Sequence, residues 1–289
     1  MISPAAQRVI SIAVVGGGYA IIAVVETIRP LRRRVEDRMR RIVRNLTVGG
    51  VSLAIMTLLQ TPLLVPAAEW AERHHFGVLR LVALPPLLNA VVAIVLLDYT
   101  LWWWHLASHK VPFLWRFHLP HHVDLDLDAS TALRFHFGEL TLSIVYRAAQ
   151  IILIGVNTYT LWIWQTILFA SILFHHSNVR LPLAFERWLV RVLVTPRMHG
   201  IHHSDCENET NSNWSSLLSC WDYLHRTMLL NVSQQSITIG VPAYRNPQEL
   251  TLGKVLTLPF RHLRDAWRTA DGRPTARPHD RAGSMQLEA

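Results

Sequence analysis

Residues 97–109 read Leu-Asp-Tyr-Thr-Leu-Trp-Trp-Trp-His-Leu-Ala-Ser-His, and they join a long apolar stretch to a pair of histidines. Positions i and i+4 lie on one face of an α-helix, so His105 and His109 should point the same way. Imidazole is the commonest metal ligand. The stretch therefore predicts a helix that presents metal ligands where it leaves a membrane.

Two further histidine clusters have the spacing H-x2-H-H: His118, His121 and His122, then His199, His202 and His203. Together with His105 and His109 they make eight histidines, whereas one tetrahedral zinc ion uses four ligands. The clusters are dispersed through patterned apolar sequence, which excludes a tag-like histidine tract. We therefore predict a two-metal centre.

Prolines predict the local structure around the second and third clusters. Thr195-Pro196 is typical of a helix start, with threonine as N-cap and proline at the first helical position. The third cluster should then lie on one face of a short helix. Pro120 would break or start a helix, so the second cluster should straddle a kink.

Composition indicates a membrane protein. Hydrophobic residues make up 51% of the chain and charged residues 17%, which is too apolar for an ordinary soluble enzyme. A spanning helix needs about 20 mostly apolar residues. Apolar runs occupy about residues 9–28, 46–68, 81–104, 140–154 and 159–174. We predict an all-α fold: an integral membrane helical bundle with about four to five spanning helices and a cytoplasmic histidine-rich helical cap.

Basic residues set the expected orientation. Arginines crowd the segment between the first two apolar runs, whereas residues 67–80 carry few basic side chains. The positive-inside rule places the arginine segment in the cytoplasm. The runs 140–154 and 159–174 form a hairpin that returns to its side of entry, so all three clusters reach the cytoplasmic face. The net charge of +8 fits anionic lipid headgroups better than nucleic acid.

Asp98 stands seven residues before His105, which is nearly two helical turns, so it should share a stripe with His105 and His109. A carboxylate within an apolar span is costly and tends to be functional. Its expected role is to accept the outer N–H of a ligating imidazole and fix the tautomer. A solvated aspartate at the helix end is the alternative.

Two more histidine sites stay open on composition alone. Residues 134–139 read Arg-Phe-His-Phe-Gly-Glu and precede the fourth apolar run, and residues 175–178 read His-His-Ser-Asn and close the fifth. A histidine in either place is a metal ligand or an interfacial polar residue.

From about residue 97 to residue 227 the ordered motifs resemble the fatty acid hydroxylase/sterol desaturase superfamily of integral membrane di-iron oxygenases. The matching pieces are Asp98-x6-His105-x3-His109, Leu114-x3-His118-x2-His121-His122, Thr131-x2-Arg134-x-His136-x2-Glu139, His176-Ser-Asn178, Thr195-Pro-x2-His199-x2-His202-His203-Ser204 and Asn213-x7-Trp221-Asp222. The resemblance implies that His136 and His176 join the eight clustered histidines as ligands. Phe137 stands where the family often has proline, and His175 beside His176 leaves that choice of ligand open.

The resemblance implies an O2-dependent oxidoreductase with two iron ions that hydroxylates or desaturates a C–H bond of a lipid, whether fatty acyl, sterol-like or related. Zinc can occupy such sites in purified samples, because metals exchange by availability as well as affinity. The sequence shows no haem-attachment motif, iron–sulfur cysteine set or flavin fingerprint. Electrons should then come from a separate ferredoxin- or cytochrome-like donor. The alternatives are a two-metal membrane hydrolase and a non-catalytic protein that binds metal or lipid.

These expectations divide the chain into four parts. Residues 1–80 form the N-terminal membrane helices with their basic cytoplasmic loop, and residues 81–230 form the catalytic region. Residues 231–269 follow as a C-terminal cytoplasmic segment. The polar residues 270–289 contain proline and glycine and are expected to be disordered.

Overall fold

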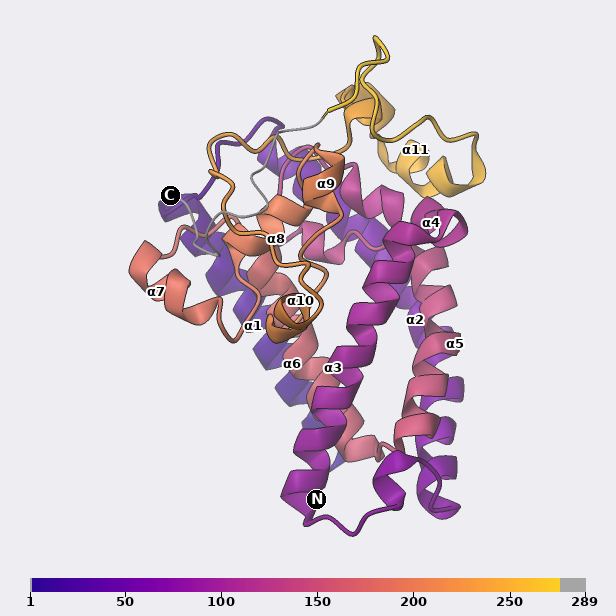
Figure 1. Ribbon diagram of the computed structural model, residues 1–289. Coiled ribbons are helices and arrows are strands. Elements are labelled where there is room, and N and C mark those ends of the chain that lie inside the picture. Colours follow the sequence, from indigo (N-terminus) through magenta and orange to yellow (C-terminus); the bar gives the residue numbers. More distant parts are fainter. Residues whose placement is uncertain (1, 276–289) are drawn as a thin grey trace.

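The computed structural model describes residues 2–275 and is built from helices (Figure 1). Within these residues, strand pairing is limited to isolated bridges. The long helices are α1 (Pro4–Ile28), α2 (Arg38–Arg73), α3 (Pro86–Lys110), α5 (Phe137–Ile154) and α6 (Thr158–His176). The predicted all-α fold is confirmed. Most of the tail that we expected to be disordered, residues 276–289, lies outside the described residues.

Helices long and apolar enough to cross a membrane comprise α1, residues 38–59 of α2, α3 and α5. Large apolar side chains stay exposed along them, among them Ile12, Leu58 and Leu87. Such surfaces are stable in lipid, where the acyl chains replace a protein partner. The fifth apolar run forms α6, which is not among these spans, since Trp, Thr and Gln residues dilute its hydropathy. The membrane bundle with four to five long helices is confirmed.

Figure 1 shows α2, α3 and α5 side by side, with the connection through η1 (Val78–Arg80) and the α5–α6 turn at one end. The two connections touch through glycines: a Cβ on Gly77 would lie 2.4 Å from the backbone nitrogen of Gly155. Gly155 has a φ of +84° and ends α5 in the left-handed conformation. Glycine adopts this conformation without strain, which permits the tight return into α6.

Short helices gather at the opposite end, which we call the capped end (Figure 1). They are α4 (Pro112–His122), η2 (Thr131–Leu133), α7 (Leu183–Leu189), α8 (Pro196–His202), α9 (Glu207–Thr210), α10 (Cys220–Leu224), η3 (Pro242–Tyr244), η4 (Pro247–Glu249), α11 (Leu252–Thr257) and η5 (Leu258–Phe260). Both α3 and α6 end here in their histidines. The capped end therefore brings all three histidine clusters to one side of the bundle.

The helix start at Thr195-Pro196 is confirmed: the Thr195 hydroxyl accepts from the backbone N–H of Met198, and Pro196 is the first residue of α8. The expected kink at Pro120 is wrong. Pro112 begins α4, and Pro120 lies inside it, in its last turn. A proline there disturbs only the final turn, because the helix ends two residues later at His122. All three histidines of the second cluster thus stand on one continuous helix.

An arginine–aspartate network fastens the start of α2 to the loop that follows α4. Its charged members are Arg41, Arg44, Asp124, Asp126, Asp128 and Arg134. Arg41 is 1% exposed and donates to Asp124 at 2.8 Å. Burial alone would raise the pKa of Asp124, but Arg41, Arg134 and Arg44 lower it to about 2. This loop begins one residue after His122, so the network fixes where the second cluster stands.

Candidate metal centre

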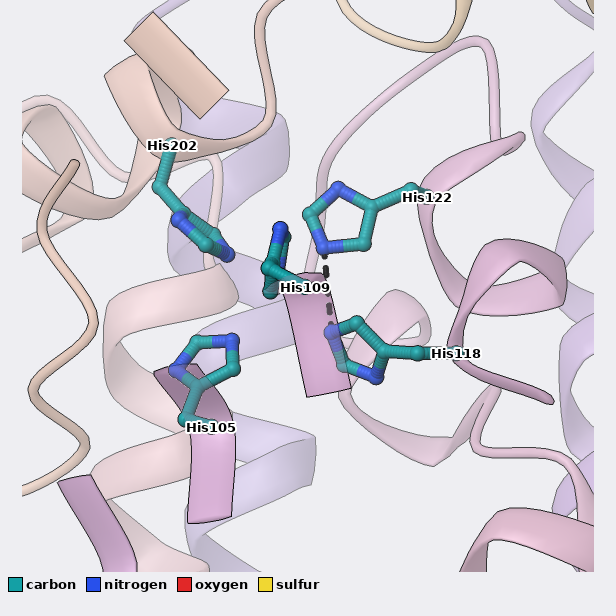
Figure 2. A group of neighbouring side chains, drawn as sticks. All are labelled: His105, His109, His118, His122 and His202. Atoms are coloured by element: carbon teal, nitrogen blue, oxygen red, sulfur yellow. Dashed lines mark hydrogen bonds between the residues drawn. The ribbon is translucent and has the colours of Figure 1, made fainter. Parts of the chain in front are cut away.

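Nine histidines converge inside the capped end in two groups. The five-histidine group consists of His105, His109, His118, His122 and His202, and the four-histidine group consists of His121, His176, His199 and His203. In each group, one ring nitrogen from every member lies within 4.8 Å of those of the others. Figure 2 shows the five-histidine group, with rings from α3, α4 and α8 turned toward one another. This convergence from separate helices is what two neighbouring metal ions require.

The groups divide each H-x2-H-H cluster by helical spacing. His118 and His122 enter the five-histidine group together, whereas His121 enters the other. In α8 and its C-cap the assignment is reversed, with His199 and His203 in the four-histidine group and His202 in the five-histidine group. Positions i+3 and i+4 point about 100° apart around a helix, since 3.6 residues make one turn. Each cluster therefore supplies both groups.

Four of the nine rings have a fixed tautomer. In each, Nδ1 lies 2.7–2.9 Å from an oxygen that can only accept, so Nδ1 carries the hydrogen and Nε2 is bare. The acceptors are Trp214 O for His105, Glu139 Oε1 for His118, Ile172 O for His176 and Ser212 O for His202. Such contacts orient an imidazole and raise its basicity as a ligand. The bare nitrogens face the interior of the groups.

Ring nitrogens of different histidines approach one another with no oxygen between them. His176 Nε2 lies 3.0 Å from Nε2 of both His121 and His199, and His118 Nε2 lies 3.1 Å from that of His122. Two ligands about 2.1 Å from one ion and at right angles would stand about 3.0 Å apart. A shared cation explains these separations better than hydrogen bonds between rings do.

Other buried ring nitrogens have no hydrogen-bond partner among the described residues. They include both nitrogens of His109, Nε2 of His202 and Nδ1 of His121, His199 and His203. An unpartnered buried polar atom costs about 1–3 kcal/mol. A cation in the five-histidine group would use Nε2 of His202 and one nitrogen of His109. The donor set, buried neutral nitrogens without competing carboxylates in either group, fits divalent transition metals.

Burial keeps these rings neutral. The pKa of His202 falls to about 3, because burial penalises the imidazolium form. The same cause lowers the pKa of His121, His122, His199 and His203 well below the ordinary value. Neutral imidazole is the form that binds metal. At neutral pH the centre is thus ready to take up a cation.

The structure does not bring His136 to either group. His136 is the N-cap of α5: its Nδ1 accepts from the backbone N–H of Gly138, and its Nε2 donates to the carbonyl of Leu256 at 3.0 Å. Both ring nitrogens are therefore in use. His176, in contrast, is a member of the four-histidine group. The neighbouring His175 is outside this group, and its ring packs at a tilt against that of His199, with centroids 4.1 Å apart.

Asp98 does not contact an imidazole as expected. Its Oδ2 accepts from the backbone N–H of Leu218 and from Trp221 Nε1 at 2.7 Å. The hydrogen of His105 Nδ1 goes instead to the Trp214 carbonyl. Asp98 is 1% exposed, so the solvated alternative also fails. Asp98 therefore joins α3 to α10 and to the segment before it.

Sequence reasoning missed the acceptors that orient the ligands. Glu139 was visible three residues after His136, but its partner is His118. The carbonyls of Trp214 and Ser212 leave no mark in a sequence. Asp222 holds this segment by accepting from the backbone N–H groups of Trp214 and Ser215. The resemblance contained Asp222 as a motif residue without giving it this role.

A family model described as fatty acid hydroxylase matches residues 90–227, the stretch that contains all nine converging histidines. This part of the chain is similar to the fatty acid hydroxylase family. The resemblance expected from the ordered motifs is confirmed. No solved structure matches the chain significantly.

Curated relatives of this chain are lipid-modifying enzymes by name. Ornithine lipid hydroxylase OlsE of Rhizobium tropici is 28% identical over 77% of this chain and 68% of its own length. Alkylglycerol monooxygenase of Homo sapiens is 24% identical over 60% of this chain and 36% of its own. Cholesterol 25-hydroxylase of Mus musculus is 25% identical over 48% of this chain and 46% of its own length. The chain thus matches about two thirds of the first relative and less than half of the other two.

Proposed function

We propose that this protein is a membrane-bound, O2-dependent di-iron oxygenase that hydroxylates or desaturates a C–H bond of a lipid. The observation that carries the proposal is the pair of buried, neutral histidine groups at one end of a membrane bundle. The relatives support the reaction class, since their names describe hydroxylases and monooxygenases of ornithine lipid, alkylglycerol and cholesterol. The substrate of this chain is a membrane lipid or a close relative of one.

The five-histidine group would hold one iron and the four-histidine group the other. Bound there, the two ions would supply O2 activation with electrons from a separate ferredoxin- or cytochrome-like donor. The protein's part is positional. Glu139 and the carbonyls of Trp214, Ile172 and Ser212 hold four rings in the ligating tautomer.

Burial of the ligands keeps water away from the proposed metal centre. His118, His122 and His202 are at most 2% exposed, so the five-histidine group is shielded from water on the sides formed by α4 and α8. Exclusion of water suppresses side reactions of an oxidising centre. The arginine-rich segment between α1 and α2 lies at the same end, because Asn178, next to the ligand-bearing end of α6, accepts from Arg32 N. By the positive-inside rule we place the centre at the cytoplasmic face.

Lipid analysis under 18O2 tests the proposal. Cells that express the wild-type chain, compared with cells that express His202→Ala, should accumulate a lipid with one 18O atom (hydroxylation) or with one further double bond (desaturation). The product should disappear under anaerobic conditions. Turnover of a lipid by the zinc-loaded protein without O2 would favour a two-metal hydrolase instead. A metal-loaded protein with no lipid product under either condition would favour a non-catalytic role.

A further inference from the structure

A hollow of about 180 Å³ lies in the C-terminal segment, away from the histidine groups. Its charged lining residues are Glu249, Lys254, Arg261 and Arg264. Glu249 accepts from Arg264 at 2.5 Å, and the Arg264 guanidinium lies 4.3 Å from the ring centroid of Tyr244. Lys254 and Arg261 have no carboxylate partner among the described residues. The hollow, which we call the C-terminal pocket, therefore carries an excess of positive charge.

The C-terminal pocket lies at the depth where α5 enters the membrane. Phe260, the residue before Arg261, is 62% exposed, and its ring centroid lies 6.3 Å from that of Phe137, the first residue of α5. Phe113 at the start of α4 is 57% exposed and contacts Phe117, which also contacts Phe260. Exposed phenylalanine rings at a membrane surface bury themselves at the boundary between headgroups and acyl chains.

Cations in a hollow beside exposed aromatic rings match the chemistry of an anionic phospholipid. Arginine and lysine side chains donate to phosphate oxygens, and phenylalanine rings pack against the upper acyl chains. An acidic protein would also complement the positive charge of the pocket. It would not, however, cover the exposed rings of Phe260 and Phe113. The position beside a spanning helix favours the lipid.

We propose that the C-terminal pocket binds the phosphate of an anionic phospholipid in the leaflet at the capped end. Lys254 and Arg261 contact the phosphate, Arg264 stays paired with Glu249 at the edge, and Phe260 rests on the acyl chains. This site is separate from the metal centre.

The C-terminal pocket is connected to the five-histidine group through an apolar cluster. Val255 and Leu258, which line the C-terminal pocket, belong to the same apolar cluster as Trp115. The Trp115 ring lies 5.1 Å from the ring of His109 and 5.5 Å from that of His122. A lipid that holds α11 and η5 in place therefore also stabilises one wall of the five-histidine group.

Photo-crosslinking in nanodiscs tests the site without any assay of turnover. The full chain is placed in phosphatidylcholine nanodiscs that contain a small fraction of photoactivatable phosphatidylglycerol, and labelled peptides are identified by mass spectrometry. We expect labelling within residues 250–264. Lys254→Gln with Arg261→Gln should reduce it by about tenfold or more, since each basic residue near a membrane surface adds roughly 1 kcal/mol.

The matched control is Arg268→Gln with Arg273→Gln, which removes the same charge from exposed side chains of the same segment that do not line the pocket. This pair should leave the labelling within about twofold. Equal losses in both double variants would overturn the proposal in favour of diffuse surface charge. Unchanged labelling in the pocket variant would overturn it as well. Millimolar inorganic phosphate should leave the labelling within about twofold, and loss of labelling would overturn the proposal by showing that free phosphate displaces the lipid.

Discussion

The histidine groups and the arginine–aspartate network are neighbours in the chain, since His122 stands two residues before Asp124. Both are buried and rich in polar atoms. In the network, opposite charges face each other: the single carboxylate of Asp124 accepts hydrogen bonds from Arg41, Arg44 and Asn45. In the histidine groups, like atoms face each other, and several nitrogens have no partner. The chain itself supplies the opposite charges of the network, although Arg44 Nε and Arg134 Nη2 make no hydrogen bond among the described residues. The facing nitrogens of the histidine groups have no opposite charge between them, so this region needs added cations.

The largest effect expected from this contrast is the loss of metal. Purified wild-type protein should contain about two metal ions per chain, because each group offers at least four nitrogens. His202→Ala and His199→Ala should each release a metal ion and abolish turnover. The measurement is elemental analysis with an activity assay.

His74→Ala is the matched control for metal content, since His74 is exposed and lies at the opposite end of α2 from the capped end. It should retain both ions. One ion per chain at full occupancy in the wild type would contradict the two-metal centre.

Acid should separate the two regions by pH. Burial lowers the imidazole pKa values, that of His202 to about 3, so in the folded protein these rings stay neutral until the pH nears 3, whereas in the unfolded chain they take up protons below about 6.5. Their contribution to stability is therefore lost as the pH falls from about 6.5 toward 3. The pKa of Asp124 is lowered to about 2, so its contribution to stability is present above about 3.9 and is lost only as the pH falls further. Stability should therefore begin to fall below about pH 6.5 while Asp124 still contributes, and the folded protein should keep its metal until the pH nears 3. Metal content and thermal unfolding measured along one pH series would check this, and loss of metal from folded protein near about pH 6 would contradict it.

Arg41→Met should break the network without removing a histidine. A buried ion pair that loses one partner typically costs about 3–5 kcal/mol, because the remaining charge stays buried and uncompensated. The free energy of unfolding in detergent should fall by this order, while the folded fraction retains its metal. Restoring balance with Arg41→Met and Asp128→Asn together should recover part of the loss, because Arg41 is the ion-pair partner of Asp128. Loss of metal at unchanged stability would show that the two regions are not distinct.

The smallest effect concerns two buried carboxylates. Glu139 accepts from His118, whereas Asp98 accepts from Leu218 and Trp221. Glu139→Gln should weaken metal affinity by about tenfold, the low end for a group that orients a ligand, because the amide is a weaker acceptor. Asp98→Asn should reduce stability and leave the metal affinity within about twofold. Metal titration by calorimetry or chelator competition measures both, and the reverse ranking would restore the role first expected for Asp98.

Much of the architecture could be predicted from the order of residues. The apolar runs predicted the long helices, since a segment of about 20 apolar residues has few stable alternatives to a spanning helix. Thr195-Pro196 predicted the start of α8, because capping depends only on adjacent residues. Pro120 misled us, since its effect depends on how soon α4 ends after it.

Sequence alone determined that His105 and His109 share a face and that the other two clusters carry ligand chemistry, because these properties follow from helical spacing and from the imidazole ring. Only the tertiary structure decided how the clusters divide between two groups, that His136 stands apart, and which carbonyl receives the hydrogen of His105. Those outcomes depend on contacts between distant residues: His105 and Trp214 are 109 positions apart, and Asp98 and Trp221 are 123 apart. Spacing along one helix fixes the direction of a side chain, but its partner is fixed only when the helices pack.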